Sequence, residues 1–568
     1  MHHGWIDPNA GFPPRFAVAG GPLDGKGAET LIELSHLAGA CDRGREAYAI
    51  WSASAEWAFF AAQREGIAPQ LSIVPGAGVT RCELAPKVAI RSARPMLPDD
   101  ALEALQNASA PDGLRAVEAS IRTMERALGV DASGGIGAST TAALFGGRWM
   151  PKWAVWPDDA PPEWAELCHD AYHGGFQRCY ETSSVATRGT AHPGMIFAGD
   201  PDEMEELPQG WRIIEVDRDS AYAEDAAGIM PDPLSEIVTD RDRLMDCAGG
   251  AIVDATVDLS GFTGEGFPVR VQVAQDASRC VPVTTGAWRG VWCSDAIRWA
   301  AESGARVEIH GGIGWTKGAR FLAPMMDRLW AQKYAYAPGL ERGVIKAAIQ
   351  RAVGRLGRRH YSTVVLCGAD ATREAENPSQ WPARWRRVHG FGSGYFVADA
   401  IELPPGLPKG TIPPWPAFVV SRAWIRLCRQ IQAFRAGGAR ILYADTDGFL
   451  AAVPPGMVLP DEHRMGGWRA KKEHAAVEHR AERQFIRIDL DGSEHLQFAG
   501  VPRSMQWDRL AGIEREYRAP NSALIDLQAA FRQVVNRLSP AIESTREGVE
   551  RAKRVGRNFA GRMDDDGF

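Results

Sequence analysis

An α/β multidomain chain is the fold class that the sequence predicts, and two observations predict it. The 568 residues exceed one domain of about 100–200 residues and indicate roughly three to five folding units. Short apolar runs typical of strands also alternate with stretches of helical periodicity. Hydrophobic residues make up 45% of the chain and charged residues 24%, so it contains enough apolar material to bury several cores.

The expected elements can be placed in chain order from periodicity and turn residues. Strands are expected over residues 15–20, 212–216 and 268–273, and residues 46–50 lead into a helix. Helices are expected over residues 55–64, 113–128, 339–359 and 417–436 and along most of the chain from about 503. Residues 151–162 hold four prolines and two tryptophans and predict a connector between domains.

Charge and cysteine content narrow the class of protein. The net charge of −7 argues against a uniformly basic nucleic-acid binder but permits local basic surfaces. The nine cysteines form no CxxC pair, which favours reduced thiols over a zinc site. A signal peptide and an apolar run of about 18 residues are both missing from the sequence. We therefore expect a cytoplasmic protein encoded by a bacterium, phage or mobile element, with no membrane partner.

Two carboxylates lie at one predicted turn. The apolar runs 440–443 and 449–453 flank Asp445-Thr446-Asp447-Gly448, which is a β-hairpin pattern with acids at its tip. Convergent carboxylates there can bind divalent ions, and nucleotidyl transfer uses two such ions about 3.5–4 Å apart. An ordinary solvated turn is the alternative for this motif taken alone.

A second acidic site precedes the hairpin in the chain. The strand at 212–216 runs directly into Asp217-Arg218-Asp219-Ser220-Ala221-Tyr222. A strand that ends in an acid can supply a metal ligand, and the serine and tyrosine that follow can form a turn beneath an incoming nucleotide. The alternative is a simple strand end in which Asp219 caps a helix. Asp219 also competes with Asp217 as the ligand.

With both sites in order, the sequence resembles the family B DNA polymerases, most closely the protein-primed branch of small phages. The family motif Asp-x-x-Ser-x-Tyr-Pro matches Asp217, Ser220 and Tyr222, with alanine in place of proline. The family motif Tyr-x-Asp-Thr-Asp-Ser matches residues 443–447, with Gly448 in place of serine. The resemblance covers about residues 165–505.

The resemblance implies roles for these acids and for a helix between them. Asp217, Asp445 and Asp447 would hold two Mg²⁺ or Mn²⁺ ions, and register favours Asp217 over Asp219. Tyr222 would lie under the sugar and exclude a 2′-hydroxyl, with Ser220 beside the nucleotide. In the family's Lys-x-x-x-Asn-Ser-x-Tyr-Gly helix only Lys346 and Gly354 match. Lys346, reinforced by Arg342 one turn earlier, would bind the triphosphate, although a solvated basic face is the alternative.

Two further matches suggest contacts with primer-template DNA. Tyr172-His173-Gly174-Gly175 resembles the family's Tyr-x-Gly-Gly motif, which contacts the template strand. Arg483 and Phe485 occupy the place of the family's Lys-x-Tyr motif at the primer end, where an arginine still binds phosphate. The implied partners are therefore primer-template DNA, a dNTP and, as one of two priming routes, a terminal protein. We expect a monomer.

The implied architecture is a right-hand polymerase with palm, fingers and thumb, preceded by an RNase H-like exonuclease-type domain. The expected limits are 1–165 for the exonuclease-like domain, 166–224 and 416–502 for the palm, 225–330 for an insertion resembling the terminal-protein region, 331–360 for the fingers, 361–415 for a second insertion and 503–568 for the thumb.

The N-terminal region departs from the family pattern. The first strand ends Val18-Ala19-Gly20-Gly21 without a carboxylate, and the other two exonuclease positions offer only Glu56 and Glu118. Two glutamates cannot build the usual four-carboxylate cage, so the sequence predicts a degenerate domain without proofreading. Asp24 is a possible substitute ligand, but the preceding Gly-Gly-Pro favours a turn.

Two other functions stay open on sequence grounds. The incomplete match in the helix of Lys346 and the missing exonuclease acids suggest a nucleic-acid-binding protein on an inactive polymerase fold. The changes at Gly448 and Gln350 suggest a polymerase with altered output, such as lesion bypass or untemplated addition. The retained Asp217, Asp445 and Asp447 argue for the active polymerase.

Overall fold

The structure is a computed structural model that describes the chain in several stretches. These are residues 97–98, 101, 110–132, 135–146, 156–180, 183–188, 204–274, 277–357, 407, 410–481 and 484–498, together with separate strands between residues 2 and 92 and between residues 365 and 400. The predictions made above for residues 55–64, for Asp24, Glu56 and Arg483, and for 503–568 lie outside the described residues.

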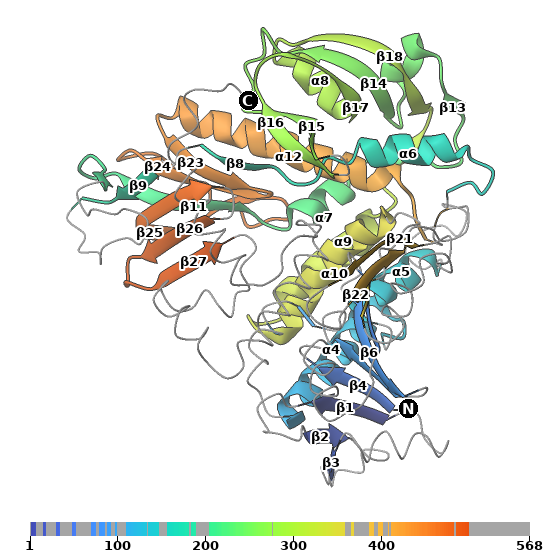
Figure 1. The fold of residues 1–568 in the computed structure, drawn as a ribbon. Coiled ribbons are helices and arrows are strands. Elements are labelled where there is room, and N and C mark those ends of the chain that lie inside the picture. The colour runs from blue at the N-terminus through green and yellow to red at the C-terminus, as the bar shows by residue number, and fades with distance from the viewer. Residues whose placement is uncertain are drawn as a thin grey trace.

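A ten-stranded sheet occupies the N-terminal part of the molecule and also includes strands from much later in the chain (Figure 1). Its order is β21 (Trp385–Gly390), β22 (Phe396–Ala400), β20 (Val365–Cys367), β5 (Gln70–Val74), β6 (Val79–Ala85), β7 (Val88–Ser92), β4 (Tyr48–Ser52), β1 (His2–Ile6), β2 (Arg15–Val18), β3 (Thr30–Glu33). Strand β20 joins the two halves by pairing antiparallel with β5. The proline- and glycine-rich segment 361–415 thus adds strands to this sheet, which its weak periodicity did not predict.

A nine-stranded sheet forms the second large layer and holds both candidate acid sites. Its main path is β10 (Glu205–Glu206), β9 (Ser183–Ala186), β25 (Trp468–Ala481), β11 (Arg212–Arg218), β24 (Gly448–Val453), β23 (Arg440–Asp445), β8 (Gln177–Cys179). Strands β26 (Gln484–Asp489) and β27 (Glu494–Phe498) extend it beyond β25. The two acid-bearing segments therefore reach the same sheet from positions more than two hundred residues apart.

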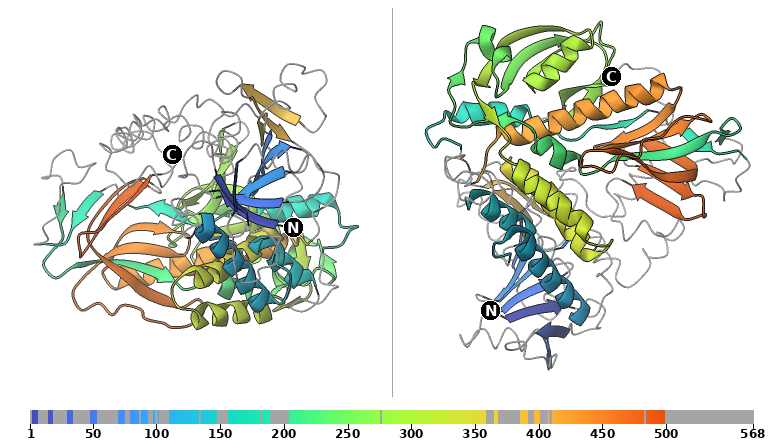
Figure 2. Two further views of the ribbon diagram at one scale, coloured as in Figure 1. Left: turned by 90° about the horizontal axis from the view of Figure 1, so that it is seen from below. Right: turned by 180° about the vertical axis from the view of Figure 1, so that it is seen from behind.

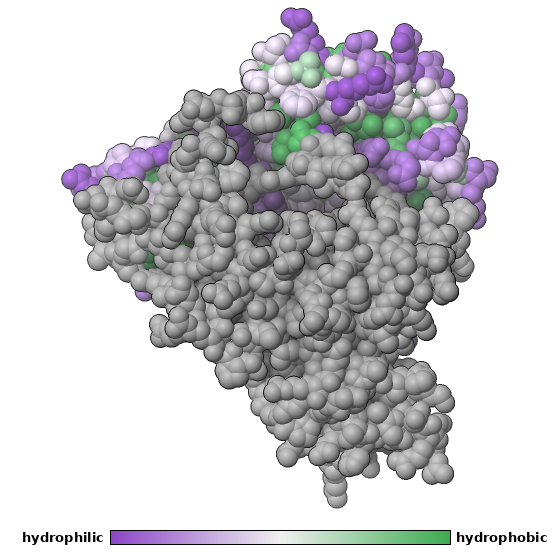
Figure 3. Space-filling model, viewed as in Figure 1, coloured by the Kyte–Doolittle hydropathy of each residue, from purple (hydrophilic) through white to green (hydrophobic). Residues whose placement is uncertain are grey.

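Residues between the two acid sites build smaller sheets of their own. One has the order β13 (Ile237–Val238), β18 (Arg306–Trp315), β14 (Ala251–Asp258), β17 (Ala287–Cys293), and two pairs are β15 (Phe267–Ala274) with β16 (Ala277–Val283) and β12 (Met230–Pro231) with β19 (Gly318–Ala319). The expected strand at 268–273 is confirmed as β15. In Figure 3, hydrophilic side chains cover the outer edge of this region, and hydrophobic atoms form a band toward the rest of the molecule.

Helices fill the space between the sheets. They are α4 (Ala110–Leu128), α5 (Ile136–Phe145), α6 (Pro162–Asp170), α7 (Ala221–Ala226), α8 (Ser294–Glu302), α9 (Ala323–Ala335), α10 (Leu340–Leu356) and α12 (Pro414–Ala436), with a 3-10 helix over Arg241–Asp246. The helices expected at 113–128, 339–359 and 417–436 are confirmed as α4, α10 and α12. Figures 1 and 2 show α9 and α10 side by side between α4 and the nine-stranded sheet.

Apolar packing on α12 fixes one face of the nine-stranded sheet. Trp424, Ile431 and Phe434 of α12 share a buried cluster with Val216 of β11 and Phe449 of β24. Burial of such large side chains contributes roughly 1.5–3 kcal/mol each. The opposite face is therefore the one on which polar side chains of β11 can gather. Among the described residues, the longest helices carry too many polar side chains to cross a bilayer.

Candidate active site

Strand alternation on β11 separates two sets of charged side chains. Successive residues of a strand point to opposite faces, and Val216 belongs to the α12 cluster. Arg218 shares that face with Val216, whereas Glu215 and Asp217 lie on the other face. Strand β11 lies between β25 and β24 and ends at Arg218, so Asp217 lies near the end of the strand and beside the hairpin tip. The expected strand at 212–216 is confirmed and extends through Arg218.

The hairpin predicted around Asp445 is present as β23 and β24. Asp445 pairs with Gly448 across the turn, and Gly448 also pairs with Asp217 on β11. The backbone N–H of Arg218 donates to the carbonyl oxygen of Asp447 at 2.9 Å. Asp217 and the Asp447 turn are therefore held together by the sheet itself.

Gly448 has a steric reason to replace the serine that the resemblance suggests. A Cβ atom at this position would lie 2.8 Å from the carbonyl oxygen of Val216 and 3.4 Å from Asp217 Oδ1. Any larger residue would push β24 away from β11 or shift the Asp217 carboxylate. The glycine thus permits close approach of two strands.

Backbone strain marks both acidic motifs. Of the described residues other than glycine, only Ser220 and Thr446 have positive φ, at 53° and 60°. Such left-handed positions are uncommon for these residue types and cluster at functional sites. Thr446 donates its hydroxyl to Asp445 Oδ1 at 2.8 Å, and its backbone N–H donates to the carbonyl oxygen of Phe176 at 2.6 Å. The turn is therefore fixed from two sides.

Electrostatics tie Asp447 to the upstream acid and to a distant lysine. The pKa of Asp447 is raised from 3.8 to about 7, first by burial and then by the negative charge of Asp217, while Lys346 and Lys471 oppose the shift. Asp445 adds a smaller rise. Asp217, Asp447 and Lys346, which lie far apart in sequence, thus share one local field.

Lys471 is a charged residue of this site that sequence reasoning missed. Its Nζ lies 3.3 Å from Asp217 Oδ2 and 3.4 Å from Glu215 Oε1. Burial lowers the pKa of Lys471, but Asp217 and Glu215 outweigh burial and raise the pKa above its ordinary value. The sequence shows two adjacent lysines shortly after Trp468, which could have been noted as a basic site. It does not show that β25 pairs with β11, and this pairing is what brings Lys471 to Asp217.

Asp219, the competing ligand, is engaged elsewhere. It is buried, and its carboxylate accepts hydrogen bonds from Lys333 and Tyr334 of α9 and, at 3.0 Å, from Ser220. Burial raises the pKa of Asp219, but the hydrogen bond from Lys333 lowers it below its ordinary value overall. Lys333 also donates to Ser220 Oγ at 2.9 Å. The cluster joins the end of β11 to α9.

Helix α10 presents basic side chains on one face. Arg342, Lys346, Gln350 and Gly354 follow at four-residue spacing, and the last three are exposed. Arg342 lies over the ring of Tyr334, with its Cζ atom 4.9 Å from the ring centroid. The charge of Lys346 opposes the rise in the pKa of Asp447, as expected for a helix face turned toward the carboxylates.

Tyr222 and the Tyr172–Gly175 segment lie beside the acids. Burial raises the pKa of Tyr222, and Tyr172, Asp447 and Asp445 add to the rise, so the phenol lies close to the site. A Cβ atom at Gly175 would lie 2.8 Å from Thr446 Oγ1, and Gly174 has a φ of +79°. The glycine pair therefore lets this segment pack directly on the Asp445–Asp447 turn.

Phe485 is placed on β26 as a buried side chain. Its ring stacks on His479 at 5.3 Å between centroids, and Arg487 lies over the ring at 4.0 Å. The structure thus gives Phe485 a packing role, and its contact with DNA stays a prediction.

The whole fold was compared with known proteins. No family model matches the chain, and no curated protein matches it in sequence. Among solved structures, Phi29 DNA polymerase complexed with primer-template DNA and incoming nucleotide substrates matches with a TM-score of 0.60 at 11% identity, covering 91% of this chain and 93% of that chain. An orthorhombic crystal form of Phi29 DNA polymerase matches with a TM-score of 0.59 at 12% identity, covering 89% of this chain and 90% of that chain.

The chain has the fold of Phi29 DNA polymerase. The match extends along nearly the full length of both chains. It confirms the overall α/β fold that the sequence resemblance implied. The boundaries of the palm, fingers, thumb and insertions, and the degenerate exonuclease site, stay predictions.

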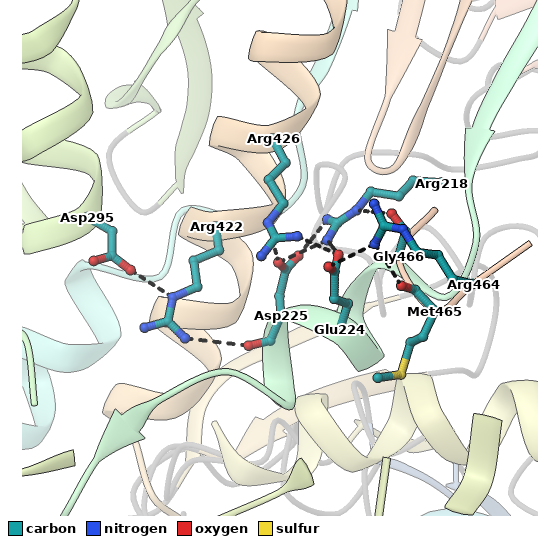
Figure 4. Close-up of polar contacts among 9 residues, drawn as sticks. All are labelled: Arg218, Glu224, Asp225, Asp295, Arg422, Arg426, Arg464, Met465 and Gly466. Atoms are coloured by element: carbon teal, nitrogen blue, oxygen red, sulfur yellow. Dashed lines mark hydrogen bonds and ion pairs between the residues drawn. The ribbon is translucent and has the colours of Figure 1, made fainter. Parts of the chain in front are cut away.

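Behind the acids of this polymerase fold lies a network of buried ion pairs (Figure 4). Arg218 donates to both carboxylate oxygens of Asp225, at 2.7 and 3.1 Å, to Glu224, and to the carbonyl oxygen of Gly466 at 3.1 Å. Arg426 of α12 pairs with the same two acids. The network ties β11, α7 and α12 to the turn before β25.

The donor set suits Mg²⁺ or Mn²⁺. These ions prefer carboxylate oxygens and complete their coordination with phosphate oxygens and water. The raised pKa of Asp447 beside Asp217 shows closely placed negative charge that a cation would stabilise. Within the described residues, no three His, Cys, Asp or Glu side chains form a ready-made metal cluster.

Proposed function

We propose that this protein is a template-directed DNA polymerase that adds deoxynucleotides by two-metal nucleotidyl transfer. The observation that carries the proposal is the pairing of Gly448 with both Asp217 and Asp445, which brings the two acidic segments together in a chain with the fold of Phi29 DNA polymerase. In this proposal β11, β23, β24 and β25 belong to the palm, and α9 and α10 belong to the fingers.

The chemistry divides between the acids and the cations of the site. Asp217 and Asp447, with Asp445 beside them, would hold two Mg²⁺ or Mn²⁺ ions, which supply charge stabilisation to the attacking 3′-hydroxyl and the pyrophosphate. Lys346 and Arg342 would bind the triphosphate as point charge and planar donor. Tyr172 and the glycines beside it would contact the template, and Arg483 and Phe485 the primer end.

Primer extension with the purified chain tests the proposal. Reactions contain a defined template, dNTPs and Mg²⁺ or Mn²⁺, with and without a DNA primer. Extension that copies the template supports it, whereas binding of DNA without any nucleotide incorporation favours a binding protein on a polymerase fold. A primer with a mismatched 3′ end tests the proposed loss of proofreading, which release of 3′ nucleotides would overturn.

Replacement of Lys346 is expected to weaken nucleotide binding. Lys346→Met removes one positive charge from the exposed face of α10 without cutting a buried contact. We expect KM for the dNTP to rise about tenfold, which corresponds to about 1.4 kcal/mol of lost binding, as measured by steady-state primer extension.

Lys317→Met is the matched control, since Lys317 is an exposed lysine in the turn between β18 and β19. Unchanged kinetic constants in Lys346→Met would remove Lys346 from the proposed site.

Replacement of Tyr222 is expected to relax sugar selection. Tyr222→Val removes the ring beside Asp447, and we expect the preference for dNTP over NTP, measured as the ratio of kcat/KM values, to fall about a hundredfold, or about 2.7 kcal/mol. Tyr222→Phe keeps the ring and should keep the preference. Equal discrimination in the valine variant and the wild type would assign sugar selection to another residue.

A further inference from the structure

A β-bulge aims Lys471 at the acid centre, which is the group of carboxylates formed by Asp217, Asp445 and Asp447. Val216 of β11 pairs with Ala470, but Glu215 pairs with Lys472, so Lys471 is the extra residue of β25. A bulge redirects the side chain of its extra residue and is frequent beside active sites. Here it brings the Lys471 ammonium to 3.3 Å from Asp217 and 3.4 Å from Glu215.

The two carboxylates that Lys471 contacts differ in what surrounds them. Asp217 lies beside Asp447, a second acid. Glu215 is held from its other oxygen, Oε2, by Arg487 at 3.3 Å and by His474 Nε2 at 3.5 Å. Glu215 is thus a fixed second partner, whereas Asp217 belongs to the group of acids that a divalent cation would bind.

We propose that Lys471 is an internal counter-cation of the acid centre, which a divalent metal ion displaces from Asp217 onto Glu215. This inference rests on the proposed function, because it requires Asp217 to be a metal ligand. Lys471 neutralises part of the acidic charge when no metal is bound, and it keeps an ion pair with Glu215 after the exchange.

The exchange makes the affinity of the centre for metal dependent on substrate. A divalent ion that binds alone must compete with the ammonium for Asp217. An ion that arrives with a triphosphate brings additional oxygen ligands, which offset the lost Lys471–Asp217 pair. Lys471 therefore suppresses binding of metal in the absence of nucleotide.

Direct measurement of Mn²⁺ binding tests this inference without using activity. Free Mn²⁺ is measured by electron paramagnetic resonance in titrations of the full chain without DNA or dNTP. Lys471→Met keeps the aliphatic stem and should bind Mn²⁺ about five- to tenfold more tightly than wild type, the scale of a partly exposed ion pair. Lys471→Arg keeps the charge and should bind within about twofold of wild type.

Lys472→Met is the matched control, because Lys472 forms its ion pair with Asp489, which is not part of the acid centre. It should bind Mn²⁺ as wild type does. Asp447→Asn should lose most of the binding, which assigns the measured ion to this centre. Thermal unfolding gives a second readout: adding Mn²⁺ should raise the Tm of Lys471→Met more than that of wild type.

The outcomes distinguish the counter-cation role of Lys471 from the existence of the metal centre itself. Loss of binding in Asp447→Asn together with wild-type affinity in Lys471→Met overturns the counter-cation and keeps the metal centre. Mn²⁺ binding that is the same in wild type and Asp447→Asn overturns both. A Lys471→Met variant that is less stable with and without Mn²⁺, with unchanged affinity, shows that Lys471 only stabilises the strands.

Discussion

Asp447→Asn is expected to lower primer extension by about a thousandfold or more while the protein stays folded. The asparagine keeps the shape of the side chain but removes the charge of a proposed metal ligand, and metal-ion stabilisation of a transition state supplies several kcal/mol. At about 1.4 kcal/mol per tenfold change in rate, a loss of about 4 kcal/mol gives this factor. Single-turnover nucleotide incorporation at saturating dNTP measures it.

Asp461→Asn is the control for this change. The Asp461 side chain is 78% exposed and forms an ion pair with the exposed side chain of His463, so wild-type rates are expected. Extension by Asp447→Asn at the wild-type rate would refute the assignment of the metal centre to the 445–447 turn.

Asp447→Asn should also stabilise the protein at high pH in the absence of metal. The pKa of Asp447 is raised from 3.8 to about 7 by burial and by Asp217, so above pH 7 the folded protein holds an ionised carboxylate at a cost on the order of a few kcal/mol. As the pH falls through 7 toward 4, the folded state takes up a proton and the cost disappears. The Tm of Asp447→Asn in EDTA should therefore exceed that of wild type at pH 8, and the excess should shrink at pH 5.5.

Arg218→Met is expected to be the most destabilising of the proposed substitutions. The Arg218 side chain is 1% exposed and that of Asp225 is fully buried, and removing one partner of a buried ion pair costs about 3–5 kcal/mol. Burial already raises the pKa of Asp225 despite the opposing effect of Arg218, which shows that its charge is poorly solvated. Urea unfolding monitored by tryptophan fluorescence measures the loss.

Two variants show whether the cost arises from the unpaired acid. Arg218→Met combined with Asp225→Asn removes the buried charge as well and should recover part of the stability. Arg464→Gln removes an exposed partner of Glu224, with a side chain 59% exposed, and should cost less than about 1 kcal/mol. An Arg218→Met variant within 1 kcal/mol of wild type would show that Asp225 is protonated in the folded protein.

Local patterns were sufficient to predict the elements that carry the acids. The hairpin at 440–453 and the strand leading to Asp217 follow from apolar runs that stop at turn residues, and both are present. The helix of Lys346 follows from its periodicity. The steric reason for Gly448 was not predictable, because it depends on the carbonyl oxygen of Val216 in a strand far away in the chain.

Features that depend on pairing between distant strands were missed for the same reason. Lys471 reaches Asp217 only because β25 pairs with β11 through a bulge, and a bulge leaves no periodic signal. Strands β20–β22 join the N-terminal sheet through β5, although the sequence around them is rich in proline and glycine. Arg218 was overlooked because its partners, Glu224, Asp225 and Arg426, become neighbours only when α7 and α12 pack together.

The alternation along β11 has a consequence for the way this gene can change. Asp217 faces the acid centre and Arg218 faces the buried ion pairs, so neighbouring residues carry opposite charges to opposite faces of the sheet. A single-codon insertion or deletion within β11 would exchange the faces, placing a guanidinium among the carboxylates and a carboxylate in the arginine network. Insertion and deletion scanning should therefore find β11 intolerant of one-residue changes in length, while point substitutions at its partly exposed start, such as at Arg212, remain acceptable.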